Sequence, residues 1–175
     1  MTAPELSRPV RIDTLGEAPR ALSVEAGAEE REELARRFGL VAIGMLGAEL
    51  ALRRRGDEVI ASGRLKAAVT QSCVASGEPV EAAIDEPFEI LFQPPRDAGS
   101  AEEEVELGES EMDVVFYEGG TIDVGEAVAE TLALSLDPYP RAPGAEAALK
   151  AAGVKSEEEA GPFGALAGLR DKLKK

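Results

Sequence analysis

The fold is decided by residues 66–93, which read KAAVTQSCVASGEPVEAAIDEPFEILFQ. Ser76 and Gly77 are typical turn residues, and Cys73, the only cysteine, lies just before them. After the turn, apolar residues occupy every second position except Glu86, as in a strand buried on one face. The stretch therefore predicts a β-hairpin with a cysteine beside its turn. The apolar positions are Ala82, Ile84, Phe88, Ile90 and Phe92.

Residues 40–55 have a mixed composition that suits a helix or a strand. A two-residue turn at Gly56-Asp57 favours the strand, because it collects small and apolar residues on one side. On the other side it places Glu49 opposite Arg64. The apolar side then pairs Leu52 with Ala61, Ala48 with Leu65, and Gly44 with Val69.

The same rule at the Ser76-Gly77 turn sets Val69 opposite Ile84 and Leu65 opposite Phe88. The middle strand then presents one apolar face to both neighbours, so we expect three antiparallel strands. Pro87 interrupts the third strand after Glu86, and proline cannot donate a hydrogen bond to a neighbouring strand. We therefore expect an edge strand or a bulge there.

A first helix is predicted over residues 28–38. Glutamates fill its early turns, Arg36 and Arg37 its last turn, and Gly39 follows. This charge order complements the helix macrodipole, and the glycine suits a C-terminal cap.

A second helix is predicted to begin at Asp123, which forms an acidic variant of the capping box with Glu126. Short strands are expected within residues 8–15, which Pro19 follows, and over residues 112–117. The buried stripe of the second helix comprises Val124, Val128 and Leu132.

These elements predict an α+β fold: a twisted antiparallel β-sheet or partly open barrel, with a packed C-terminal helix and a shorter N-terminal helix. We expect a single domain over residues 1–143, with a mobile acidic loop at 94–111. Residues 144–175 are expected to form a flexible tail with a short terminal helix.

The charge of the chain favours basic partners. Its 175 residues include 34 acidic and 19 basic side chains, a net charge of −15 that repels polyphosphate at long range. One cysteine forms no internal disulfide, no Cys or His cluster suits zinc, and histidine, the commonest general base, is absent. The sequence shows neither a signal peptide nor a long apolar run, so we expect a cytoplasmic protein that does not enter the membrane.

Two blocks of the sequence resemble the YceD family, the large ribosomal RNA subunit accumulation proteins. The first is the Cys73 hairpin; the second runs from Thr121 through Glu130 to Pro140. The resemblance covers residues 40–143, and the ending from Gly161 to Leu166, followed by lysines, is similar to the tail of bacterial members.

The resemblance implies a non-catalytic factor that promotes accumulation of large-subunit ribosomal RNA and ribosome biogenesis. The acidic surface favours an adaptor for a basic ribosomal protein or an assembling subunit, without a cofactor, metal or small-molecule substrate. The acidic loop is the expected first contact, and the family pattern includes an acidic residue at Glu130. The partner-binding candidates are Cys73, Glu102, Glu103, Glu104, Asp123 and Glu130.

Cys73 has two interpretations. It is a reactive thiol or metal ligand, or more simply a small, half-buried apolar residue. Some YceD relatives are expected to carry several cysteines near this turn and near the segment after the second helix. Residues 138–143 contain none here, so no zinc site is carried over.

Two further hypotheses remain open. The basic residues Arg53, Arg54, Arg55, Arg64 and Lys66 are RNA-contact candidates, although charge that protects a strand edge explains them more simply. The basic residues of the tail can contact phosphate in the same way or serve solubility. A metal-dependent nuclease would use Asp123, Glu126 and Glu130, for which a cap and a solvated helix face is the simpler interpretation. The tail residues are Arg170, Lys172, Lys174 and Lys175.

Overall fold

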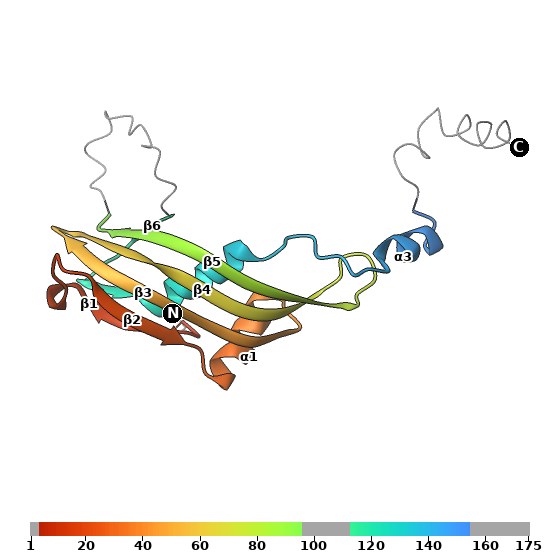
Figure 1. Cartoon of the computed structure of the whole chain (residues 1–175), viewed down its shortest axis with the longest axis horizontal. Coiled ribbons are helices and arrows are strands. Elements are labelled where there is room, and N and C mark those ends of the chain that lie inside the picture. Colours follow the sequence, from red (N-terminus) through yellow and green to blue (C-terminus); the bar gives the residue numbers. More distant parts are fainter. Residues whose placement is uncertain (1–3, 96–112, 155–175) are drawn as a thin grey trace, which may run out of the picture. The chain divides into compact units, whose positions relative to one another are not determined.

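The computed structural model describes residues 4–95 and 113–154 (Figure 1). These residues fall into two compact units. The first comprises Met1–Gln71 and Glu81–Asp137, and the second comprises Ser72–Val80 and Pro138–Lys175. Most of the predicted acidic loop, and the predicted terminal helix, lie outside the described residues. The division between a domain ending at residue 143 and a flexible tail stays a prediction.

The first unit is built on a five-stranded sheet in the order β2-β3-β4-β5-β6 and a small sheet of β1 and β7. Its helices are α1 and α2, and the second unit contains α3. The strands are β1 (Pro9–Arg11), β2 (Arg20–Glu25), β3 (Ala42–Arg55), β4 (Glu58–Ser72), β5 (Pro79–Gln93), β6 (Asp113–Phe116) and β7 (Thr121–Asp123). The helices are α1 (Ala28–Phe38), α2 (Val124–Ser135), α3 (Ala145–Ala151) and a single 3-10 turn, Ile12–Thr14.

The hairpin of β3 and β4 confirms most of the predicted pairing. Leu52 lies opposite Ala61, Ala48 opposite Leu65, and Glu49 opposite Arg64. The prediction was wrong at the far end, where Ile43 rather than Gly44 faces Val69. A register shift between Ile43 and Met45 inserts one extra residue into β3, as a β-bulge does.

The third predicted strand is β5, which lies beside β4 as expected. Its other neighbour, β6, runs parallel to it and pairs only with Ile90–Gln93. Among the described residues, the part of β5 before Ile90 therefore has one strand neighbour, so Pro87 lies at an edge, as predicted. The mostly antiparallel, open sheet confirms the predicted α+β class.

The N-terminal strands differ in part from the prediction. Within residues 8–15, where a short strand was expected, only Pro9–Arg11 forms one, and it pairs with β7. Strand β2, which follows Pro19, was not predicted; it pairs with β3 from Arg20 opposite Leu52 to Glu25 opposite Gly47. Its alternation is short, with Val24 as its one fully buried residue.

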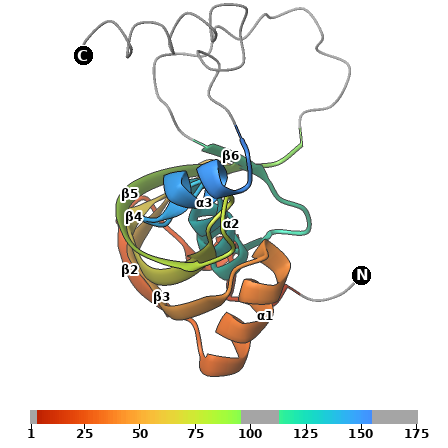
Figure 2. The ribbon, with the colours of Figure 1, turned by 90° about the vertical axis from the view of Figure 1, so that its right-hand side faces the viewer.

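Helix α2 shares one core with the sheet. Val124 and Val128 are 1% exposed and Leu132 is fully buried, which confirms the predicted stripe. These residues belong to the same buried cluster as Leu65 and Phe92 of the sheet. Figure 2 shows α2 inside the curl of the strands, so the helix completes the core that an open sheet leaves unfilled.

Helix α1 has its predicted bounds, and Gly39 ends it in the left-handed conformation at φ 66°. In the second unit, α3 occupies part of the segment 144–175 that was expected to be a flexible tail. None of the described helices has the length and apolar character needed to cross a membrane.

Gly125 is placed where the N-terminal segment crosses the start of α2. A Cβ atom at this position would lie 2.5 Å from the carbonyl oxygen of Leu6 and 2.9 Å from the backbone nitrogen of Arg8. Backbone atoms cannot move aside as a flexible side chain can, so only glycine fits here.

We expect Gly125→Ala to lower the free energy of unfolding by about 1–3 kcal/mol, because it overpacks this crossing. Urea unfolding measures the change. Gly16→Ala is the control, since a Cβ atom there meets no atom within 4 Å. Equal stability of the two variants would contradict the close approach.

Candidate functional site

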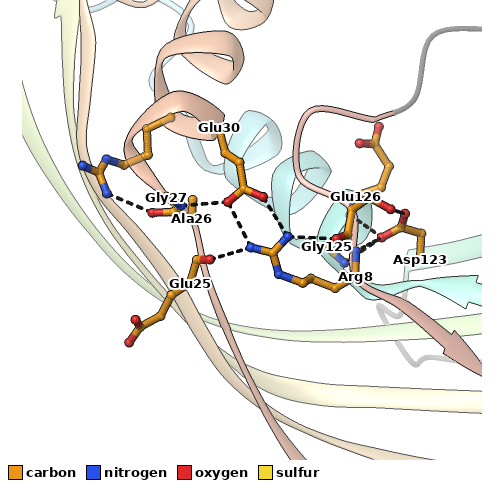
Figure 3. Close-up of polar contacts among 10 residues, drawn as sticks. Arg8, Glu25, Ala26, Gly27, Glu30, Asp123, Gly125 and Glu126 are labelled. Carbon is orange, nitrogen blue, oxygen red and sulfur yellow. Dashed lines mark hydrogen bonds and ion pairs between the residues drawn. The ribbon is translucent and has the colours of Figure 1, made fainter.

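Asp123, a predicted partner-binding residue, is engaged within the protein (Figure 3). One carboxylate oxygen accepts hydrogen bonds from the backbone N–H groups of Arg8 at 2.8 Å, Gly125 at 3.0 Å and Glu126 at 3.2 Å. The other accepts one from the Ser7 hydroxyl at 2.5 Å. Asp123 is therefore the N-cap of α2, as predicted, and also anchors the N-terminal segment.

Arg8 extends this anchor to α1. Its guanidinium group donates to both carboxylate oxygens of Glu30, at 2.8 and 2.9 Å, and to the carbonyl of Glu25 at 2.9 Å. Glu30 also accepts the backbone N–H of Gly27 at the start of α1. The hydrogen bond from Arg8 is the main cause that lowers the pKa of the Glu30 carboxyl, against the opposing effect of burial.

Arg37 joins α1 to α2 in a second place. It donates to both oxygens of Glu126, at 3.0 and 2.7 Å, and to Glu5 at 2.9 Å. The side chain of Glu126 therefore binds Arg37 instead of completing the predicted capping box. Glu130 is exposed on α2, but the protein atoms around its carboxyl displace part of the water; this desolvation, followed by repulsion from Glu126, raises its pKa, while Arg37 opposes the rise.

The carboxylates of the nuclease hypothesis are not assembled as a metal site. Asp123 holds backbone and hydroxyl donors, Glu126 holds Arg37, and Glu130 is exposed on α2. Within residues 4–95 and 113–154, no group of three or more His, Cys, Asp or Glu residues is arranged to hold a metal ion.

Cys73 lies in the second unit and is 3% exposed. Its sulfur accepts a hydrogen bond from the Ala142 backbone N–H at 3.3 Å, and the Val74 N–H donates to the Pro140 carbonyl at 2.9 Å. The structure thus joins the cysteine turn to residues 138–143, the two regions where the resemblance places cysteines in relatives. Cys73 packs there with Ala142 and Ala145.

The sulfur environment favours the thiolate. The hydrogen bond from Ala142 and then that from Ser76 lower the pKa of Cys73 from 9.0 to about 7, and burial opposes the shift. The sulfur is therefore surrounded by groups that donate hydrogen bonds, and these stabilise its negative charge.

The predicted RNA-contact residues fall into two places. Arg53 and Arg55 are exposed at the tip of the β3–β4 hairpin, whereas Arg54 donates to the carbonyls of Gly56 and Ile12. Arg64 lies six residues along β4 from the tip residue Glu58, about 20 Å away at the usual rise per residue. The structure therefore does not bring the five basic residues into one cluster.

Arg64 and Lys66 have acidic neighbours. Arg64 forms an ion pair with Asp85. Both basic residues line a hollow of about 370 Å³ on the outer face of β2, β3 and β4, together with Glu25 and Glu49. A hollow of mixed sign lacks the positive potential that a phosphate backbone requires.

The acidic residues gather where basic residues are absent. No lysine or arginine occurs from Ala67 to Pro95 or from Asp113 to Pro140, the segments that contain β5, β6 and α2. On β5, Glu81, Glu86 and Glu89 are exposed. Within the described part of the chain, none of these three forms an ion pair, whereas Asp85 pairs with Arg64.

These glutamates lie on the open edge of β5, which we call the acidic edge and define as residues 81–89. At its end, β6 adds exposed apolar side chains: Val114 is 45% exposed and Phe116 is 59% exposed. No sequence motif predicted this site, although the long interval without Lys or Arg signals it. Of the predicted acidic contacts, Glu102, Glu103 and Glu104 lie outside the described residues.

We expect Asp123→Ala to lower the free energy of unfolding by about 1–3 kcal/mol, because α2 loses its cap and the Arg8 N–H loses its acceptor. Chemical denaturation measures the loss. Glu17→Ala, on an exposed loop, should stay within about 0.5 kcal/mol of the parent protein. An Asp123→Ala protein as stable as this control would show that the anchor contributes nothing.

Cys73 should titrate near pH 7, which thiolate absorbance at 240 nm detects, with Cys73→Ser as the blank. Because folding lowers its pKa, its stabilising effect is complete above about pH 9 and is lost as the pH falls through about 7. The difference in free energy of unfolding between the parent protein and Cys73→Ser should therefore decrease as the pH falls from about 9 to below about 7. A thiolate titration with its midpoint near pH 9 would contradict the hydrogen bonds that Ala142 and Ser76 donate to the sulfur.

A protein-family model identifies the chain. The model of the large ribosomal RNA subunit accumulation protein YceD matches residues 61–170, which include β5, β6 and α2. No curated protein and no solved structure matches the chain. The family description indicates a role in the accumulation of large-subunit ribosomal RNA. With the match covering more than half of its length, the chain belongs to the YceD family.

Proposed function

We propose that this protein is a non-catalytic cytoplasmic factor that acts as an acidic adaptor for a basic ribosomal protein or an assembling large subunit. In this role it would promote the accumulation of large-subunit ribosomal RNA. The observation that carries the proposal is the acidic edge, where Glu81, Glu86 and Glu89 are exposed without a cationic partner among the described residues.

Unpaired carboxylates suit a basic partner for two physical reasons. Binding at Glu81, Glu86 and Glu89 breaks no ion pair among residues 4–95 and 113–154, so within that part of the chain the attraction is not offset by a lost contact. A net charge of −15 also attracts basic proteins at long range and repels nucleic acid. Salt should weaken the association, because the charges lie on the surface.

The other hypotheses have less support. For direct RNA binding, Arg53 and Arg55 are available at the hairpin tip, whereas Arg54 and Arg64 are engaged within the protein. For a nuclease, the carboxylates of Asp123 and Glu126 already bind groups of the protein itself. The adaptor needs neither a metal nor a cofactor.

The test compares the capture of purified large-subunit ribosomal proteins with that of protein-free ribosomal RNA. We expect the parent protein to capture basic ribosomal proteins at low salt, because its edge carboxylates attract them. A variant with Glu81→Gln, Glu86→Gln and Glu89→Gln should lose about tenfold in affinity, the effect of a few exposed charges acting together.

The matched control carries Glu17→Gln, Glu29→Gln and Glu32→Gln, which removes the same charge from exposed positions elsewhere. It should bind like the parent protein. Equal losses in both variants would mean that net charge alone acts. Tight binding of bare ribosomal RNA at moderate salt, abolished by Arg53→Gln and Arg55→Gln, would replace the adaptor by the RNA-contact hypothesis.

A further inference from the structure

We infer that the acidic edge binds an extended, lysine- and arginine-rich polypeptide segment by strand pairing, which adds a strand to the sheet beside β5. This inference rests on the proposed function and names the form in which the basic partner is recognised. Its basis is the geometry of the β5 backbone.

The backbone of β5 leaves one set of polar groups facing the open edge. Just before β5 begins, the carbonyl of Glu78 accepts a hydrogen bond from the backbone N–H of Cys73, which lies on the β4 side. At the end of β5, the carbonyl of Gln93 accepts a hydrogen bond from the backbone N–H of Tyr117, which lies on the β6 side. The less exposed side chains of β5 are the even-numbered ones both before and after Glu86, whose own side chain is exposed, so the strand keeps one parity between these points. Because backbone groups alternate with the same period, odd-numbered residues direct their N–H and C=O groups toward the open edge.

Pro87 fits this geometry. It has odd parity, so its missing N–H lies on the open side and β5 loses no hydrogen bond to β4. The donors at the open edge are then the N–H groups of Glu81, Ala83, Asp85 and Glu89. The Asp85 carbonyl already accepts a hydrogen bond from Arg64 at 3.3 Å, so the other odd-numbered carbonyls are the acceptors.

Charge selects the occupant. An incoming strand would pass beside Glu81, Glu86 and Glu89, and beyond them would reach the start of β6, where Asp113 lies opposite Ile90 and the exposed Val114 follows. Lysine or arginine side chains meet the carboxylates, and an apolar residue at the end of the segment meets β6. A second copy of β5 would bring glutamates against glutamates, which repel each other.

The experiment uses the full-length protein and a labelled peptide of about eight residues with alternating lysine and valine, the length of an ordinary strand. A second peptide has the same sequence with alternate backbone amides N-methylated, so it keeps its charge and loses its hydrogen-bond donors. Fluorescence anisotropy measures both affinities. We expect the methylated peptide to bind about tenfold or more weakly, because several backbone hydrogen bonds are lost.

A variant of the protein tests the same pairing from the other side. Ala83→Pro removes one N–H at the open edge and should weaken the parent peptide about three- to tenfold, the effect of one hydrogen bond. Ala83→Ser keeps that N–H and should bind within about twofold. Hydrogen exchange should show that the peptide protects the Glu81, Ala83 and Asp85 amides. If Ala83→Pro fails to fold, the methylated peptide still gives the answer.

The outcomes separate this inference from the proposed function. The two peptides could bind the parent protein equally, while the Glu81→Gln, Glu86→Gln, Glu89→Gln variant binds them more weakly. That result would overturn strand pairing and leave the acidic adaptor in place. Capture of ribosomal proteins without binding of the parent peptide would do the same. If neither ribosomal proteins nor the peptide bind, the acidic charges only protect the strand edge, and both proposals fail.

Discussion

The carboxylate of Asp123 holds three parts of the chain at one point: the end of β7, the start of α2 and the N-terminal segment at Ser7 and Arg8. A buried helix has few ways to fix its position along a curved sheet, because apolar contacts are non-directional. Hydrogen bonds supply the missing direction. Arg8 then passes the constraint to α1 through Glu30, and the close crossing at Gly125 leaves no space for an alternative path.

This arrangement explains how the charges of the protein become separated. Arg8 and Arg37 are used to join α1, α2 and the N-terminal segment, where each is paired with glutamate. The acidic residues of β5 lie in a part of the sequence without lysine or arginine, so most of them stay unpaired within the described structure. The family match begins at Ala61 and so includes the acidic edge, whereas Arg8 and Glu30 precede it.

Turn residues and apolar alternation predicted the parts of the fold in which the paired residues are close in sequence. The Gly56-Asp57 turn and the alternation on both strands fixed the pairing of Glu49 with Arg64, but a bulge at Gly44 has no such signal and shifted the end of β3. Strand β2 was missed because its apolar alternation is short.

The roles of the site residues depended on contacts distant in sequence. Asp123 was recognised as a helix cap, yet its bonds to Ser7 and Arg8 span more than a hundred residues and follow from no local pattern. Arg54 and Arg64 look alike in the sequence as cations, and only the folded chain shows that each already has acceptors. The acidic edge could have been found from the distribution of charge, whereas the backbone groups of β5 that have no strand partner in the described structure could not.

The described residues of the first unit separate charges of opposite sign, and such a separation is an electric dipole. Exposed arginines end the β3–β4 hairpin, and β5 carries glutamates that form no ion pair among the described residues. Under the proposed function, such a molecule would experience a torque as well as an attraction near a ribosomal particle, where nucleic acid and cationic proteins lie side by side. The torque would turn β5 toward the basic protein and the hairpin tip away from it, so that the orientation would be selected before any contact forms.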